Sequence, residues 1–143
     1  SMKFDIVYSS LAFHYVPDFQ KLANDIYNLL NTGGYLLFSQ EHPIVTATFD
    51  GKQHYNKDEN GNYTSFTFSN YNQPGERDTF WYVDGVKKYH RTFSNIISAL
   101  CRVGFVIDTV CEPSPIENAT DFIPNILEKE LIKPTFLIVK ASK

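Results

Sequence analysis

The feature that most constrains the fold is a buried strand close to the start of the sequence. Its residues, Phe4 to Ser10, are followed by a helical pattern and by a second apolar strand from Tyr35 to about Gln40. A strand–helix–strand unit forms a parallel pair that normally lies inside a larger sheet. The sequence therefore predicts the second half of an α/β domain, with the first half absent from these 143 residues.

A helix is predicted between these two strands. Asp18 is a suitable N-cap, and apolar residues recur at helical spacing from Phe19 to Leu30. We expect Gly33 to stop the helix in the left-handed position that follows a helix end. The next strand is apolar almost throughout, which is typical of a central parallel strand covered on both faces.

The character of the sequence changes over residues 45–89. Aliphatic residues become scarce, aromatic residues accumulate, and Asp50-Gly51, Asn60-Gly61 and Asp84-Gly85 are turn or hairpin signals. A stretch of this length is too long for a plain connector. We interpret it as a small antiparallel β insertion on a single partial α/β domain, whose core is formed by residues 3–44 and 90–143.

The last third of the chain continues the α/β pattern. Thr92 is the predicted cap of a helix that ends at Gly104, and strands are predicted from Phe105 to Val110 and from Thr135 to Lys140. Only a loop and a short helix separate these two strands, so they can pair in an antiparallel manner. That pairing places one reversed strand in an otherwise parallel sheet.

Composition excludes several classes of partner. The formal net charge of −3 gives no electrostatic reason to expect nucleic acid. No apolar run approaches a membrane span of about 20 residues, and no signal peptide is visible. Cys101 and Cys111 are favoured as free, mostly buried thiols over a disulfide, which fits a reducing compartment. We therefore expect a cytoplasmic protein with neither membrane nor nucleic-acid partners.

Several segments together resemble a known family. Residues 4–16, from Phe-Asp-Ile-Val-Tyr to His-Tyr-Val, and residues 29–39, Leu-Leu-Asn-Thr-Gly-Gly-Tyr-Leu-Leu-Phe-Ser, are similar to the fourth strand, its loop and the fifth strand of class I S-adenosylmethionine-dependent methyltransferases. More narrowly, they resemble the small-molecule group called methyltransferase type 11, although Asn31-Thr32 stands where that group commonly has Lys-Pro. Glu41-His42-Pro43 and Tyr89-His90-Arg91-Thr92 resemble a subgroup with an inserted substrate cap. The resemblance implies the C-terminal half of a Rossmann-like methyltransferase sheet.

The resemblance also implies S-adenosyl-L-methionine as the cofactor of the parent enzyme. The family holds it mainly through a glycine-rich turn after the first strand and an acidic residue that ends the second. None of the seven glycines in this chain forms a G-x-G pattern after a strand. We therefore expect weak or no cofactor binding, and little or no activity, from this chain alone.

The predicted ligand site lies beyond the carboxyl ends of the strands, as in other open α/β sheets. The resemblance implies that the backbone of Ser9, Ser10 and Leu11 faces the cofactor and that His14 faces the transferred methyl group or the substrate. His14 is a candidate general base, because the pKa of histidine lies near neutrality. The alternatives are that it simply lines the pocket, or that it is a loop histidine bonded to the backbone.

Six further residues are predicted to bind a small-molecule substrate: Glu41, His42, Tyr71, Arg77, His90 and Arg91. Glu41 follows the second strand and either orients His42, binds a substrate amine or is a solvated carboxylate. Aromatic side chains with one or two guanidinium groups suit a planar or anionic substrate, although a small β subdomain also needs aromatic residues for its own core. The histidine spacing matches no recognised metal site, so no metal is expected.

Two functions stay open, and a third is disfavoured. The first is a fragment of a small-molecule methyltransferase, and the second is a non-catalytic binding or oligomerisation module that reuses half of the fold. Half of a nicotinamide-dependent dehydrogenase is disfavoured by the long aromatic insertion and by the lack of a glycine-rich turn. The free edge of the strand from Phe4 to Ser10 is expected to pair with another copy or with a second polypeptide.

Overall fold

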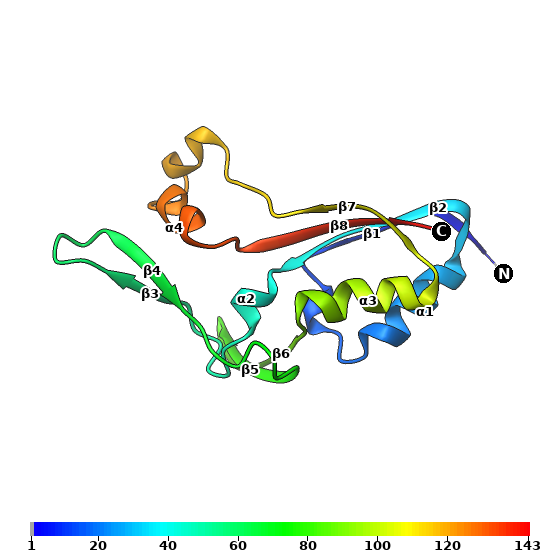
Figure 1. Cartoon of the computed structure of the whole chain (residues 1–143), viewed down its shortest axis with the longest axis horizontal. Helices are drawn as coiled ribbons and strands as arrows, with labels where there is room; N and C mark the ends of the chain where they lie inside the picture. Colours follow the sequence, from blue (N-terminus) through cyan, green and yellow to red (C-terminus); the bar gives the residue numbers. More distant parts are fainter. Residues whose placement is uncertain (1) are drawn as a thin grey trace.

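The computed structural model describes residues 2–143, and its centre is a four-stranded sheet (Figure 1). The strand order is β1-β2-β8-β7. The strands are β1 (Phe4–Ser10), β2 (Leu30–Glu41), β7 (Val106–Cys111) and β8 (Phe136–Ser142). β1 and β2 are parallel, whereas β8 runs antiparallel to both β2 and β7. The predicted α/β sheet with a reversed last strand is therefore confirmed.

Helices α1 (Phe19–Leu29) and α3 (Phe93–Val103) lie on the same side of this sheet (Figure 1). Each begins where a side chain satisfies a free backbone N–H group. The Asp18 carboxylate accepts the Lys21 N–H at 2.9 Å, and Thr92 forms a capping box with Asn95. α3 ends at Gly104, which has a φ of 115° and adopts the left-handed conformation.

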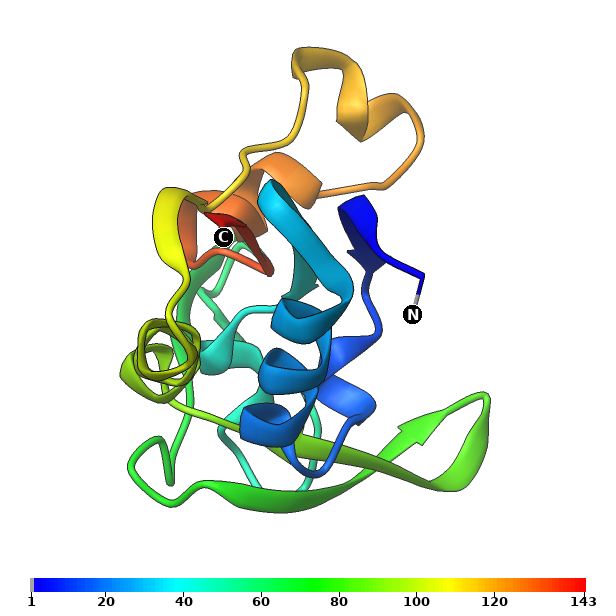
Figure 2. The ribbon, with the colours of Figure 1, turned by 90° about the vertical axis from the view of Figure 1, so that its right-hand side faces the viewer.

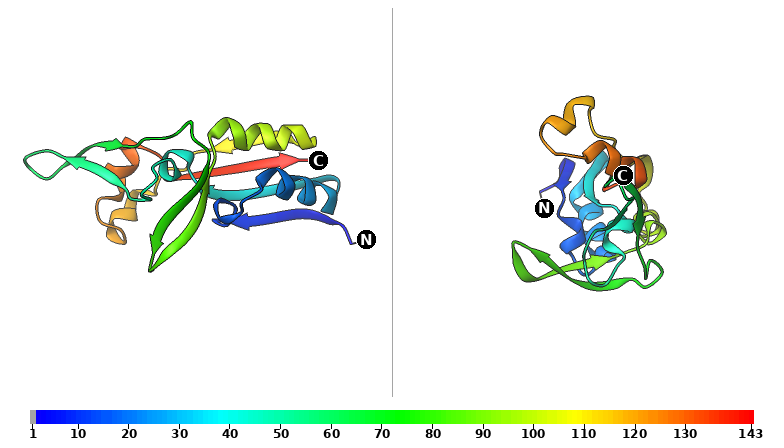
Figure 3. Two further views of the ribbon diagram at one scale, coloured as in Figure 1. Left: turned by 90° about the horizontal axis from the view of Figure 1, so that it is seen from below. Right: turned by 90° about the vertical axis from the view of Figure 1, so that its left-hand side faces the viewer.

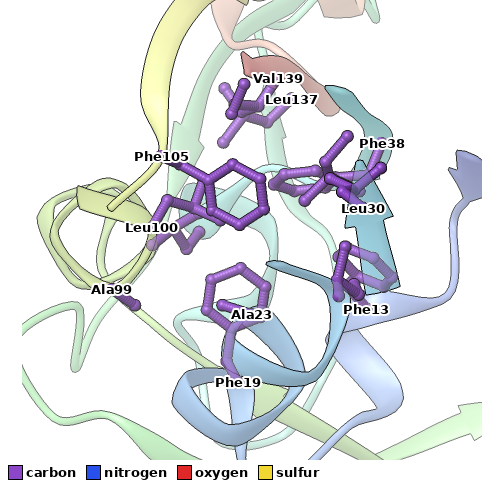
Figure 4. Close-up of a cluster of buried hydrophobic side chains, with 14 residues drawn as sticks. Phe13, Phe19, Ala23, Leu30, Phe38, Ala99, Leu100, Phe105, Leu137 and Val139 are labelled. Carbon is purple, nitrogen blue, oxygen red and sulfur yellow. The ribbon is translucent and has the colours of Figure 1, made fainter. Parts of the chain in front are cut away.

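The hydrophobic core fills the space between these helices and the sheet (Figure 4). Phe38 of β2 and Leu137 and Val139 of β8 are fully buried there, and Leu100 of α3 packs in the same cluster. The ring centroids of Phe13 and Phe38 are 4.8 Å apart. Burial of a side chain of this size contributes about 1.5–3 kcal/mol, so this one layer stabilises the fold.

The opposite face of the sheet is open. Side chains alternate along a strand, and Ile6, Tyr8 and Val106 on this face are 50%, 67% and 65% exposed. The Lys140 ammonium lies 4.7 Å from the ring centroid of Tyr35 and covers part of it. The expectation that β2 is covered on both faces is therefore wrong for residues 2–143, because α1 and α3 cover the same face.

Helix α1 ends earlier than we expected from the position of Gly33 and Gly34. Its last residue is Leu29, and Leu30 is already extended, so Gly33 is not the residue that stops the helix. Gly33 still adopts a φ of 81°, but within the assigned range of β2. Gly34 is the sterically required glycine, since a Cβ atom there would lie 2.9 Å from the Asp5 carbonyl oxygen. The pair therefore serves the close approach of β1 to β2.

Residues 43–90, which contain the predicted insertion of residues 45–89, form a short helix and two antiparallel hairpins (Figure 3). Helix α2 is Pro43–Thr46. One hairpin pairs β3 (His54–Lys57) with β4 (Tyr63–Thr67), and the other pairs β5 (Gly75–Trp81) with β6 (Val83–His90). The second hairpin extends past the helices, as Figure 2 shows.

Only one of the three turn signals joins two strands as expected. The turn that contains Asn60-Gly61 connects β3 to β4, and the Gly61 N–H donates to the Asp58 carbonyl at 3.1 Å. The second hairpin reverses at Tyr82, which has a φ of 59°, and Asp84-Gly85 lies within β6. Asp50-Gly51 forms a turn ahead of β3 instead of linking two strands.

Short helical segments complete the chain: η1 (Phe13–Tyr15), η2 (Glu117–Asp121) and α4 (Ile126–Ile132). Cys101 and Cys111 are both free, as expected, but both are exposed, so the prediction of buried thiols is wrong. Within residues 2–143, the structure contains no helix with the length and apolar character needed to span a membrane.

Candidate functional site

A cleft of about 630 Å³ lies where the carboxyl ends of β1 and β2 meet the insertion and α4. The part nearest the sheet is lined by Leu11, His14 and Tyr15 after β1 and by Glu41 at the end of β2. The rest includes Tyr55, Phe80 and Lys88 from the insertion, Lys129 of α4 and Lys133, which directly follows α4. Open α/β sheets bind ligands at this edge, so we take the cleft as the candidate site.

Leu11 makes the sharp exit from β1. Its φ of 51° is unusual for a residue other than glycine and carries backbone strain. The Leu11 N–H donates to the Ser39 carbonyl oxygen at 2.9 Å, which holds this conformation. Of the three residues predicted to face the cofactor, Leu11 lines the cleft, while Ser9 is half-buried and Ser10 is exposed.

His14 lines the cleft and is only 3% exposed. Its Nδ1 atom accepts the Glu41 N–H at 3.3 Å, so the neutral ring carries its proton on Nε2. Burial lowers the pKa of His14, partly opposed by the Glu41 carboxylate. In this geometry the second ring nitrogen is a donor, and the general-base role stays a prediction.

Glu41 forms an ion pair with Lys88 inside the cleft. The Lys88 Nζ atom lies 2.7 Å from Glu41 Oε1, and the two side chains are 10% and 18% exposed. The Lys88 ammonium also lies 5.9 Å from the ring centroid of Tyr15. Glu41 is therefore neither a solvated carboxylate nor the partner of His42, and its Lys88 partner was not singled out from the sequence.

His42 is used to begin helix α2. Its Nδ1 atom accepts the Ile44 N–H at 3.2 Å, and its Nε2 atom lies 2.8 Å from Glu112 Oε1. Both ring nitrogens are therefore occupied by the protein, and His42 is absent from the lining of the cleft. The geometry gives His42 a structural role at the start of α2, and its predicted substrate contact stays a prediction.

Arg77 is bonded entirely to the backbone of the insertion. Its guanidinium donates to the carbonyl oxygens of Ala47 (2.8 Å), Gln73 (2.7 Å), Asn70 (3.4 Å), Gly75 (3.3 Å) and Glu76 (3.2 Å). An arginine has five N–H groups, so none is left for a substrate anion. The Phe49 ring lies 4.0 Å from the guanidinium carbon. In this geometry Arg77 holds the insertion together, and its predicted contact with a substrate stays a prediction.

His90 and Tyr71 join the insertion to α3. His90 is 1% exposed; its Nε2 atom bonds the Tyr71 carbonyl oxygen and its Nδ1 atom the Thr46 hydroxyl, each at 2.8 Å. The Tyr71 hydroxyl accepts the Phe93 N–H at 2.9 Å. Burial lowers the pKa of His90. Neither residue lines the cleft, and the substrate contacts of both stay predictions.

Arg91 ties the loop around η1 to the start of α3. Its guanidinium donates to the carbonyl oxygens of Phe13 (3.3 Å), Val16 and Pro17 (3.1 Å). Burial lowers its pKa to about 10. Arg91 also lies outside the cleft, which leaves His14 and Glu41 as the predicted catalytic and substrate-binding residues that line it.

Lys133 is a cleft residue that sequence reasoning missed. It is the first residue after α4 and is only 4% exposed. Its Nζ atom donates to the Thr135 hydroxyl at 3.1 Å. Tyr55, also missed, lies beside it, and burial raises the pKa of Tyr55 to about 12. The four-residue spacing of Lys129 and Lys133 near a predicted short helix was the available signal.

Neither the acidic and histidine side chains nor the glycines form a recognised binding motif in the described residues. Among the described residues, no three His, Cys, Asp or Glu side chains are grouped so that they could hold a metal ion. The glycines with positive φ lie in turns, within strands or after α3, and none forms a glycine-rich turn between a strand and a helix.

The chain is similar to known methyltransferases in sequence and in structure. A family model described as a methyltransferase domain matches residues 1–38. The crystal structure of an S-adenosylmethionine-dependent methyltransferase from Mesorhizobium loti is 38% identical with a TM-score of 0.85, covering 98% of this chain and 62% of that one. The crystal structure of a putative S-adenosylmethionine-dependent methyltransferase from Listeria monocytogenes is 31% identical with a TM-score of 0.82, covering 99% of this chain and 62% of that one. An uncharacterized protein of Haemophilus influenzae is 36% identical over 110 residues, 77% of this chain and 43% of that protein.

These similarities confirm the resemblance to class I S-adenosylmethionine-dependent methyltransferases, whose fold this chain shares. The chain spans 62% of each of the two solved structures and less than half of the Haemophilus influenzae protein. S-Adenosylmethionine is the cofactor of the family, and a glycopeptide N-methyltransferase that shares only the fold, at 14% identity, is known in complex with it.

Replacing Arg77 by lysine is expected to destabilise the insertion. Lysine keeps the positive charge but has three donors at one point, so at least two of the five carbonyl groups lose their partner. The free energy of unfolding should fall by about 2–4 kcal/mol, measured by denaturant titration, with faster hydrogen exchange in residues 47–90. Arg102→Lys, at an exposed position of α3, is the matched control. An unchanged stability for Arg77→Lys would contradict the structural role.

The two buried histidines are expected to make stability decrease with acidification. Because burial lowers the pKa of His14 and His90 below the ordinary value of 6.5, the unfolded chain binds protons there that the folded chain does not. The free energy of unfolding is then largest above pH 7 and falls as the pH drops below 6.5. Replacing both residues by glutamine should flatten this slope, whereas His54→Gln, at a side chain that is 41% exposed, should not. A flat profile for the natural chain between pH 7 and pH 5 would refute the argument.

Proposed function

We propose that this chain is the substrate-side part of an S-adenosylmethionine-dependent methyltransferase that acts on a small molecule. The observation that carries the proposal is the cleft at the carboxyl ends of β1 and β2. Its volume of about 630 Å³ is in the usual range for small-molecule sites, roughly 300–1,000 Å³. The insertion and α4 close it on the side away from the sheet, which suits a substrate cap.

The proposal includes a second part that carries most of the cofactor site. The chain spans 62% of the Mesorhizobium loti enzyme, and its own glycines form no cofactor-binding turn. The outer edge of β1 has no strand paired to it among the described residues, and one sheet face is open. A strand–turn–helix unit beside β1 would extend the sheet and bring the cofactor to Leu11. On this proposal the chain alone has little or no activity.

The cleft residues have positioning roles in this proposal. Methyl transfer requires the protein chiefly to hold the acceptor atom in line with an already activated methyl group. His14 is fixed by the Glu41 N–H and presents its Nε2–H group, which can orient an acceptor oxygen or nitrogen. The free, exposed thiols of Cys101 and Cys111 fit a reducing compartment, so we also propose a cytoplasmic location.

Calorimetric titration with S-adenosylmethionine tests the proposed function. The 143-residue chain should bind weakly or not at all, because the glycine-rich turn is absent. A polypeptide extended at its amino end by the upstream coding sequence should bind one equivalent and transfer the methyl group to a small acceptor. Tight stoichiometric binding by the short chain would refute the incomplete site, and an extended polypeptide that binds no cofactor would refute the proposed activity.

A second candidate function is a non-catalytic binding or oligomerisation module, and the bare edge of β1 favours it. Unpaired strand edges recruit other strands. Ile6 and Tyr8 are at least half exposed beside that edge, and Phe4 is 42% exposed. We propose that the edge pairs with a second copy of the chain or with another polypeptide.

Sedimentation of the purified chain over a range of concentrations tests the edge. Self-association is expected, and Ile6→Lys should weaken it at least about tenfold, because an added charge blocks strand pairing and repels its copy. Phe122→Lys replaces another apolar residue, 76% exposed and far from β1 in the sequence, and should leave association unchanged. A chain that stays monomeric at every concentration would rule out self-pairing.

A further inference from the structure

Lys133 places a buried ammonium in the wall of the cleft, and it forms no ion pair with the residues that the structure describes. The residue is 4% exposed, and its Nζ atom donates to the Thr135 hydroxyl at 3.1 Å. No carboxylate of the described part of the chain lies within 4.0 Å of this ammonium. Burial lowers the pKa of Lys133, against the opposing effects of Glu130 and Glu41. A buried charge with so little compensation is costly.

The two carboxylates of the cleft are already committed elsewhere. Glu130 accepts the Thr135 N–H at 3.1 Å and also the Thr135 hydroxyl. Glu41 pairs with Lys88 at 2.7 Å. The cleft is lined by these two carboxylates and by three lysines, Lys88, Lys129 and Lys133. One positive charge is therefore left over, and Lys133 is its most buried carrier.

Contacts with aromatic rings do not replace the missing anion. The Lys133 ammonium lies 5.1 Å from the ring centroids of both Tyr55 and Phe66, which is within cation–π range. These contacts help α4 to pack against the β3–β4 hairpin. Lys129 makes the same kind of contact with Tyr55 and Tyr63, at 5.4 Å and 4.9 Å, from a half-exposed position. Packing alone therefore does not require a buried ammonium at Lys133.

We propose that Lys133 binds a carboxylate of the ligand that occupies this cleft, and that the rest of the ligand is a planar, apolar body. Tyr15, Tyr55, Phe80 and Phe136 supply aromatic walls for that body, and one carboxylate balances the single excess charge. The inference rests on the proposed function, which it deepens by naming the class of acceptor. The backbone N–H of Glu41 donates to His14, and the Glu41 carboxylate acts electrostatically on Lys133. The His14 Nε2–H donor and the Lys133 ammonium therefore belong to neighbouring parts of one cleft.

The test compares two probes of similar shape in the full 143-residue chain. Benzoate carries a carboxylate, and benzyl alcohol is its neutral counterpart. Binding is followed by two-dimensional NMR of backbone amides, and we expect benzoate to bind at least about tenfold more tightly, with shifts centred on residues near Lys133. Equal affinity for the two probes, or no benzoate binding at millimolar concentrations, would overturn the proposal.

Three variants separate charge from packing. Lys133→Met keeps an unbranched side chain against Tyr55 and Phe66 and should abolish the preference for benzoate while leaving benzyl alcohol binding unchanged. Lys133→Arg should retain the preference. Lys140→Met, on the open face of the sheet, is the control and should bind as the natural chain does. Retention of the full preference by Lys133→Met would refute the assignment.

A second measurement covers the case in which Lys133→Met does not fold. In the natural chain, benzoate binding should weaken as sodium chloride is raised, because chloride screens and competes for the ammonium, whereas benzyl alcohol binding should not. Salt-independent benzoate binding would count against the proposal. Neither probe needs the cofactor, so the anion site can fail while cofactor binding by the extended polypeptide succeeds, and the reverse.

Discussion

The parallel pairing of β1 with β2 is the constraint on which the candidate site depends. Parallel strands end at the same edge of a sheet, so the segments that follow them must meet. Two hydrogen bonds join these segments: the Leu11 N–H donates to the Ser39 carbonyl oxygen, and the Glu41 N–H donates to the side-chain Nδ1 atom of His14. The hydrophobic core between the helices and the sheet holds β1 and β2 in place, and the position of these strands determines where the cleft lies. The sheet therefore fixes where the cleft lies, while the insertion and the segment around α4 supply most of its lining.

The insertion obeys a different requirement, which is the pairing of buried backbone groups. A small subdomain has few ladder hydrogen bonds, so many carbonyl oxygens need side-chain donors. Arg77 satisfies five of them and His90 another, and Arg91 serves the loop around η1 in the same way. Residue types that are typical of substrate binding here form hydrogen bonds to the backbone of the chain itself. The charged groups that line the cleft come from the end of β2, from β6, and from α4 and its C-cap residue.

The sequence predicted the parts of the structure that depend on local pattern. Periodicity located β1, α1, α3 and the reversed last strand, and Asp18 and Thr92 cap the helices as expected. Long-range contacts decided the rest. The close approach of β1 to β2 explains Gly34, whereas nothing local indicates that Arg77 meets five carbonyl groups or that Lys88 meets Glu41. His14 and Glu41 could be predicted as site residues because they follow the ends of two predicted strands. Lys133 could not, because only the folded chain brings it to the cleft.

One face of the sheet carries apolar side chains that α1 and α3 do not cover. β2 is apolar on both faces, yet α1 and α3 bury only one, and the other leaves Ile6, Tyr8 and Val106 exposed. Covering apolar surface contributes roughly 25 cal/mol per Å², so an element placed on this face stabilises the sheet. A strand added at the edge of β1 would carry its own helices over that face and would also stand next to Leu11. In the proposed enzyme, the same contact thus completes the core and brings the methyl donor to the cleft.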